Sequence, residues 1–188
     1  MITYTWSISR LDCAPLENGL TNVVKIINWG LTRTDENGIT ASLNNYYPLP
    51  SPSPEAFEKI IGKKITNWTE TRGMCGRLQY CTTEDDLVYH CDGQTLAGMV
   101  YLTPDAPFSC GTSLYAHKDT KLRNENDFED TNVFEGGYYD KSKFELVDTA
   151  GNVFNRLVLF DAKCIHSANE YFGTTKENSR LFHLFFFD

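Results

Sequence analysis

Residues 156–168 read RLVLFDAKCIHSA, and this stretch decides the class of fold that we expect. Its apolar first half predicts a buried strand, and Asp161-Ala162 predicts a turn. His166 follows among small residues and would present its imidazole at the entrance of a strand. Taken alone, such a histidine is more often a hydrogen-bonded core residue than a metal ligand, so its meaning depends on the rest of the chain.

Short runs of β-branched and aromatic residues recur on both sides of this stretch and end at Gly, Asn, Asp or Pro. We expect strands at Tyr4–Ile8, Asn22–Trp29, Ile39–Leu43, Arg77–Cys81, Leu87–Cys91, Ala97–Leu102, Gly111–Ala116, Phe144–Ala150, Arg156–Asp161 and Leu181–Phe187. Ser53 as N-cap and Pro54 at the first helical position predict one helix start. The chain therefore reads as a mainly β protein with few helices.

Prolines divide the chain. Residues 48–54 hold four of them, which no helix interior or central strand accommodates, so we expect a linker there. We predict a small β-rich module over residues 1–50, a linker and short helix over 51–72, and a core domain over 73–188. The alternative is that residues 1–50 add strands to the sheet of the core domain. Residues 117–140 are polar and predict a long surface insertion.

Composition narrows the function. The chain has 188 residues and a net charge of −8, which argues against a broad nucleic-acid-binding face. No apolar run is long enough to span a membrane, and the N-terminus lacks the pattern of a signal peptide. We therefore expect a cytoplasmic protein. None of the six cysteines forms a C-x2-C pair, so we expect reduced thiols rather than a zinc site.

The segment VYHCDG at residues 88–93 offers a second candidate ligand group. In a strand, His90 and Asp92 project from the same face and can converge on one ion. Two histidines and one carboxylate make the facial triad of non-haem iron oxygenases, although a lone H-x-D is common by chance. His117 and His183 are interpreted as structural, because Asp119 runs into a polar loop and His183 is out of phase with Arg180.

Arg180 opens an almost wholly apolar run, residues 181–187. A guanidinium there is costly unless it pairs with an anion, and it binds a carboxylate through two parallel hydrogen bonds. The alternative is an arginine exposed at the end of a strand. With His90, Asp92 and His166, it suggests a site for a metal and an anionic co-substrate.

Five motifs in this order resemble the Fe(II)- and 2-oxoglutarate-dependent dioxygenases of the prolyl-hydroxylase-like kind. They are His90-Cys91-Asp92, Tyr101-Leu102-Thr103-Pro104, Gly111-Thr112-Ser113-Leu114-Tyr115, His166 and Arg180. The ending FGTTKENSRLF is most like bacteriophage and bacterial members, and for a phage-encoded protein the expected cytoplasm is that of the host. Residues 1–50 faintly resemble a small β-rich domain of tailed-phage proteins. The chain departs from the family in having only residues 54–76 for a supporting helical layer.

The resemblance implies a double-stranded β-helix, or jelly roll. It implies iron held by His90, Asp92 and His166, and 2-oxoglutarate held by Arg180 with Tyr101 beside it. Such an enzyme couples decarboxylation of 2-oxoglutarate to succinate with oxidation of a substrate by dioxygen, with ascorbate as an auxiliary reductant. In such an enzyme the 117–140 segment, with Phe134, Tyr138 and Tyr139, would be a substrate lid whose deletion spares iron binding. The substrate and the oligomeric state are unknown. Two alternatives stay open, a cupin-like metal protein and a phage structural protein with an inactive barrel.

Overall fold

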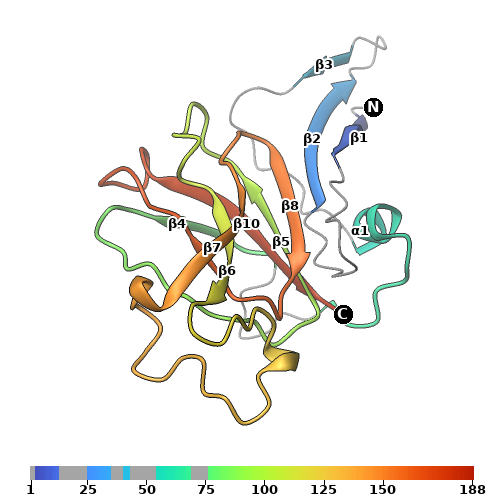
Figure 1. Ribbon diagram of the computed structural model, residues 1–188. Coiled ribbons are helices and arrows are strands. Elements are labelled where there is room, and N and C mark those ends of the chain that lie inside the picture. Colours follow the sequence, from blue (N-terminus) through green and yellow to red (C-terminus); the bar gives the residue numbers. More distant parts are fainter. Residues whose placement is uncertain (1–2, 13–24, 35–39, 43–53, 69–75) are drawn as a thin grey trace.

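The structure, a computed structural model, describes residues 3–12, 25–34, 40–42, 54–68 and 76–188 (Figure 1). Over these residues it is mainly β, as the sequence predicts, with two antiparallel sheets and one α-helix. In chain order the elements are β1 (Thr3–Asp12), β2 (Lys25–Thr34), β3 (Thr40–Ser42), α1 (Pro54–Ile61), β4 (Leu78–Cys81), β5 (Leu96–Tyr101), β6 (Thr112–His117), η2 (Glu125–Asp127), η3 (Lys141–Lys143), β7 (Phe144–Ala150), β8 (Arg156–Asp161), β9 (His166–Ala168) and β10 (Arg180–Phe187).

The larger sheet has seven strands in the order β1-β2-β8-β5-β10-β4, with β3 paired to β2. Strand β2 pairs with β8 from Lys25 opposite Leu159 to Asn28 opposite Arg156. The N-terminal strands thus continue the sheet of the second half instead of forming a sheet of their own. This pairing corresponds to the alternative in which the front adds strands to the core. The linker expected at 48–54 lies outside the described residues except for Pro54.

The smaller sheet has three strands in the order β7-β6-β9. Beside β9, residue His90 forms an isolated antiparallel bridge with His166. The last eight extended segments therefore pair in a nested way: β4 with β10, the His90 segment with β9, β5 with β8, and β6 with β7. In each pair, one segment comes from the first half of residues 78–187 and the other from the second half.

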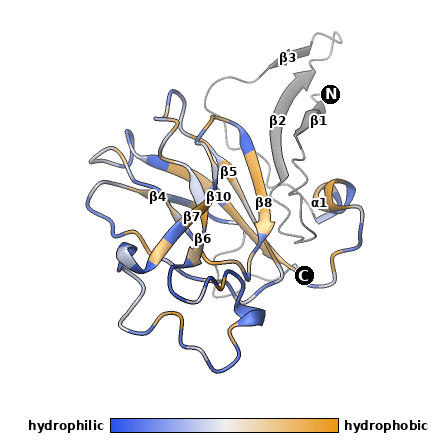
Figure 2. Cartoon of the chain, viewed as in Figure 1, coloured by the Kyte–Doolittle hydropathy of each residue, from blue (hydrophilic) through white to orange (hydrophobic). Residues whose placement is uncertain are grey.

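Strand β10 shows why one strand is apolar on both faces. Phe182, Leu184 and Phe186 line a cavity between the sheets, whereas Phe185 and Phe187 pack on the outer side against Phe57 of α1. A strand covered on both faces needs apolar residues at successive positions, which explains the almost continuous apolar run. Figure 2 shows this apolar colouring along β8 and β10 and the polar colouring of the loops.

Helix α1 covers the outer face of the larger sheet. Phe57 is fully buried, and its ring centroid lies 5.2 Å from that of Trp68. A Cβ atom at Gly98 of β5 would lie 2.9 Å from Leu159 Cδ2 and 3.3 Å from Phe57 Cε1. The glycine therefore allows the helix to approach the sheet closely. No helix in the described part of the chain is long and apolar enough to cross a membrane.

The 117–140 segment covers the outer face of the smaller sheet and lies at the bottom of Figure 1. It was expected to be a polar surface insertion, yet Phe128 and Val133 are buried in a cluster with Tyr89, Tyr115 and other residues. Its regular structure is limited to the short turn η2. Buried apolar side chains thus help to hold an otherwise irregular segment on the sheet.

From residue 77 onward the predicted strands lie within one residue of the observed ones, with two exceptions, whereas the predicted ends at Ile8 and Trp29 fall four and five residues short of the ends of β1 and β2. Leu87–Cys91 is not a strand, because its only ladder contact is the bridge at His90, and the Tyr89 amide instead donates to the Tyr138 carbonyl. Strand β9 was not predicted, since three residues give too little periodicity. The turn expected at 35–38 lies outside the described residues. Four described cysteines, Cys81, Cys91, Cys110 and Cys164, are free as expected.

Candidate functional site

A cavity of about 710 Å³ lies between the two sheets. Its wall includes His90, Asp92 and His166 together with Arg180, so it brings together the predicted ligand group and the predicted anion-binding residue. This volume is within the usual range of small-molecule sites, roughly 300–1,000 Å³. Residues from β4, β5, β6, β8, β9 and β10 reach it, which shows that the site depends on both sheets.

Both histidines of the cavity are oriented through their Nδ1 atoms. The His90 Nδ1 lies 3.0 Å from the Val88 carbonyl oxygen, and the His166 Nδ1 lies 2.8 Å from the Cys164 carbonyl oxygen. A carbonyl oxygen only accepts, so each Nδ1 carries a proton, and in the neutral ring each Nε2 has a free lone pair. This is the second contact that metal-binding histidines usually make.

The two free Nε2 atoms face one carboxylate. His90 Nε2 lies 3.7 Å from Asp92 Oδ1, and His166 Nε2 lies 3.3 Å from Asp92 Oδ2. One ligand atom from each of the three residues falls within 4.8 Å of the others. Two ligands at right angles on one ion, each about 2.1 Å from it, lie about 3 Å apart. The three side chains therefore fit around a single divalent ion after a small contraction.

Electrostatics favour the protonation states that a metal needs. Burial lowers the pKa of His90, and the neighbouring His166 lowers it further. Burial alone would raise the pKa of Asp92, but a hydrogen bond from the protonated His166 ring and the positive charges of His166, His90 and Lys163 in their protonated forms bring it below its usual value. At neutral pH the group thus offers an ionised carboxylate and a neutral His90 ring, which is the form that binds metal.

The Asp92 end of the group is held by the main chain. The Asp92 amide donates to the Ala162 carbonyl at 2.8 Å, and His90 and His166 exchange both amide-to-carbonyl bonds, at 3.1 and 2.9 Å. These bonds replace the strand geometry that the sequence suggested for residues 87–91. The side chain of His90 is 37% exposed, against 7% for His166, so the group is open on the His90 side.

Arg180 is buried at the start of β10, with 1% of its surface exposed. Its Nε donates to the Cys110 carbonyl at 3.0 Å, its Nη2 donates to Thr112 Oγ1 at 3.0 Å, and its Cζ lies 4.6 Å from the Phe182 ring centre. In the described part of the chain, Nη1 makes no hydrogen bond and no carboxylate pairs with the guanidinium. A buried cation with only neutral partners favours an anionic ligand.

Tyr101, the other residue expected to contact the co-substrate, is fully buried but does not belong to the cavity wall. Its hydroxyl donates to Thr112 Oγ1 at 2.9 Å, and Thr112 does line the cavity. The structure therefore places Thr112 between Tyr101 and the cavity. The strand motif at 111–115 contained Thr112, but nothing in the sequence marked its hydroxyl as the partner of both Tyr101 and Arg180.

Further wall residues were not predicted as site residues. Gln79 of β4, Gln94 and Tyr171 line the cavity, and Tyr138 reaches it from the 117–140 segment. No periodicity or motif distinguishes these glutamines from other polar residues of the chain. Tyr138 lay in the segment that we expected to cover the site. Phe134 and Tyr139 do not line the cavity, and His117 and His183 also lie outside it.

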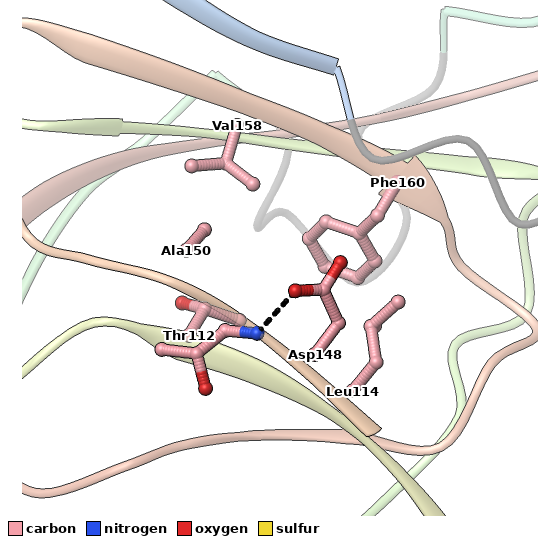
Figure 3. A pocket seen from close by; sticks show the side chains of 7 residues that line it. Thr112, Leu114, Asp148, Ala150, Val158 and Phe160 are labelled. Carbon is pink, nitrogen blue, oxygen red and sulfur yellow. Dashed lines mark hydrogen bonds between the residues drawn. The ribbon is translucent and has the colours of Figure 1, made fainter. Parts of the chain in front are cut away.

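A second hollow lies between β6, β7 and β8 (Figure 3). Figure 3 shows Val158 and Phe160 facing Leu114 across it, and the dashed line marks the Thr149 amide donating to Asp148 Oδ1 at 2.7 Å. Its volume is about 10 Å³. A single water needs roughly 10–15 Å³ by this kind of measure, so this hollow is too small for a substrate.

Comparisons with known proteins give two family matches. Residues 1–75 match a domain of unknown function, DUF7936, and residues 77–170 match a family of unknown function, DUF6445. No curated protein matches the sequence. The second match includes His90, Asp92 and His166 and ends before Arg180. Because it covers half of the chain, the protein belongs to the family of unknown function DUF6445.

Proposed function

We propose that the protein is an Fe(II)- and 2-oxoglutarate-dependent dioxygenase acting on a substrate yet to be identified. The observation that carries the proposal is the presence of the His90, Asp92 and His166 group and of the buried Arg180 on the wall of one cavity. Two imidazoles and one carboxylate leave open positions on an octahedral ion, which suits non-haem iron.

The strand pairing supports a double-stranded β-helix. In such a jelly roll two long arms of chain fold back on each other, so that the pairs are nested from the outermost to the innermost. The pairs β4 with β10, the His90 segment with β9, β5 with β8, and β6 with β7 have this order. Both histidines then come from the second nested pair, which accounts for their meeting although 76 positions separate them.

Charge balance supports a dianionic co-substrate. Asp92 and Arg180 carry the only formal charges among the described residues of the cavity wall when the histidines are neutral. With one divalent ion, the enclosed charge would be two positive units in excess. A ligand with two carboxylates, such as 2-oxoglutarate, neutralises that excess, and a guanidinium is suited to the carboxylate far from the metal.

The residues divide the work. Iron bound by the three side chains would supply the oxidative chemistry of dioxygen and the keto acid. Arg180 and Thr112 would orient the far carboxylate of the co-substrate, since both present hydrogen-bonding groups to the cavity. Phe160, Phe182 and Leu184 make that part of the wall apolar and limit access of water. The exposed side of His90 leaves room for a substrate.

The test is binding followed by turnover. Titration calorimetry without oxygen should show one Fe(II) bound by the wild type and by His117→Ala, and none by His90→Ala. Arg180→Met should keep Fe(II) binding and lose most of its affinity for 2-oxoglutarate. Under air, with ascorbate, the wild type should form succinate.

The outcomes separate the candidates. A wild type that binds Fe(II) but binds 2-oxoglutarate no better than Arg180→Met does would favour a cupin-like metal protein. A wild type that binds neither would support an interaction protein with an inactive barrel, and the proposal would be withdrawn.

A further inference from the structure

We propose that the 117–140 segment is a clamp that positions both histidines of the candidate metal site, with Asn124 as its main positioning residue. This inference rests on the proposed function, because it concerns the same metal site. From the sequence, we expected the segment to act as a substrate lid whose deletion spares iron binding. The contacts of the segment lead to a different expectation.

The first contact is made by Asn124. Its Nδ2 donates to Asp161 Oδ2 at 2.9 Å and approaches Cys164 Sγ at 3.5 Å. The other oxygen of Asp161 accepts from the Lys163 amide at 2.9 Å, and the Cys164 amide donates to the Asp161 carbonyl at 3.0 Å. Asn124 and Asp161 together therefore fix the turn at residues 161–164.

That turn holds two of the three candidate ligands. The Cys164 carbonyl accepts from the His166 ring at 2.8 Å, and the Ala162 carbonyl accepts from the Asp92 amide at 2.8 Å. A shift of the turn would rotate the His166 imidazole and displace the Asp92 main chain together. Contacts of this kind behind a metal ligand usually change metal affinity by about 10–100-fold when they are removed.

The second contact is main-chain pairing on both sides of Asn124. The Glu125 amide donates to the Lys163 carbonyl at 2.8 Å, and the Ile165 amide donates to the Arg123 carbonyl at 2.7 Å. Residues 123–125 thus run antiparallel to 163–165, with an isolated bridge between Asn124 and Cys164. Ile165 is fully buried and immediately precedes His166. The segment is therefore tied to the chain that carries this histidine.

The third contact is on the other histidine. The Tyr138 carbonyl accepts from the Tyr89 amide at 2.7 Å, and Tyr89 immediately precedes His90. Phe128 and Val133 pack in one cluster with Tyr89 and Ile165. The 117–140 segment therefore contacts Tyr89 and Ile165, the residues that immediately precede the two histidines. By linkage, a metal that holds the histidines must also stabilise the segment.

The experiment compares Asn124→Ala with Asn126→Ala, whose side chain is exposed and makes no hydrogen bond with the described residues. Co(II) affinity is measured by calorimetry without oxygen, and the folding of each apo variant is checked by thermal unfolding. We expect Asn124→Ala to bind Co(II) about 10–100-fold more weakly and to alter the Co(II) visible spectrum. Asn126→Ala should match the wild type in both measurements.

A second measurement needs no variant, so it holds even if Asn124→Ala does not fold. Hydrogen exchange of the wild type should slow at the amides of Tyr89, Glu125 and Ile165 when Co(II) binds. Wild-type Co(II) affinity in a folded Asn124→Ala, or unchanged exchange in a metal-loaded wild type, would overturn the clamp and leave the proposed function standing. If the wild type does not bind Co(II), both the clamp and the proposed metal site are contradicted.

Discussion

The outer faces of the two sheets are covered in different ways. On the larger sheet, helix α1 and Trp68 form a regular aromatic layer over β5, β8 and β10. On the smaller sheet, the 117–140 segment covers the face with little regular structure. The first cover lies behind the sheet that carries Arg180, and the second lies behind the two histidines. We infer that the first mainly stabilises the fold, whereas the second also shapes the site.

The largest effect on stability is expected for Phe57→Ala. The Phe57 ring lies 4.9 Å from that of Phe185 and 5.3 Å from that of Phe187, and its removal leaves a cavity under the helix. The free energy of unfolding should fall by about 3–5 kcal/mol. Urea unfolding measures this, and Co(II) affinity of the folded fraction should stay within a factor of about two. A large loss of metal affinity in Phe57→Ala would contradict the inference that the first cover mainly stabilises the fold.

The next largest effect concerns metal-dependent stability. Co(II) at about 100 times its dissociation constant should raise the free energy of unfolding of the wild type by about 2.7 kcal/mol. His166→Ala should show no such increase, because it removes the most buried imidazole of the group. Thermal unfolding with and without Co(II) measures this. His183→Ala is the matched control, since its ring bonds the Gly76 carbonyl outside the cavity, and it should keep the increase.

Val133→Ala tests the second cover directly. Val133 is 2% exposed, and the loss of two methyl groups should cost about 1–3 kcal/mol. Unlike Phe57→Ala, it should also weaken Co(II) binding, because Val133 packs in the cluster that contains Tyr89 and Ile165. Calorimetry on both variants gives the comparison. Equal metal affinities in the two variants would contradict the difference drawn between the covers.

The smallest effect on stability is expected at Asp188, which follows β10 and accepts hydrogen bonds from Asn67, next to Trp68, and from Thr95. Hydrogen bonds from Thr95 and Asn67 lower the pKa of Asp188. The ionised form therefore stabilises the fold above the unfolded pKa of about 3.9, and this contribution is lost as the pH falls through the lower folded value. Asp188→Asn should cost at most about 1 kcal/mol at pH 7 and less near pH 2. An equal cost at both pH values would contradict this.

Much of the β framework was predictable because local patterns of apolar and turn-forming residues indicate strands. Strands β7 and β8 were predicted with their observed ends, and Pro54 begins α1 as expected. The prediction of a strand at 87–91 was wrong. Apolar alternation does not show how many residues of a segment pair with a neighbour, and here only His90 does. The path of residues 1–50 was also not readable, because the pairing of β2 with β8 depends on a partner more than 120 positions away.

The candidate site was predictable only in its charged residues. His90, Asp92, His166 and Arg180 stand out because a buried charge or imidazole in an apolar strand needs a reason. The roles of Asn124 and Asp161 were not readable, because ordinary polar residues in loops carry no pattern that distinguishes a positioning contact from a solvated side chain. Their meaning comes from distances across 37 positions of sequence.

The pairing of β2 with β8 has a consequence for how the chain can be divided. The two family matches meet between residues 75 and 77, which invites expression of the second part alone. Such a fragment would leave β8 with an unpaired apolar edge, and without α1 the side chains of Leu157 and Leu159 would lose their cover. Exposed edges of this kind promote aggregation. The limit of a family match is therefore not the limit of a soluble unit.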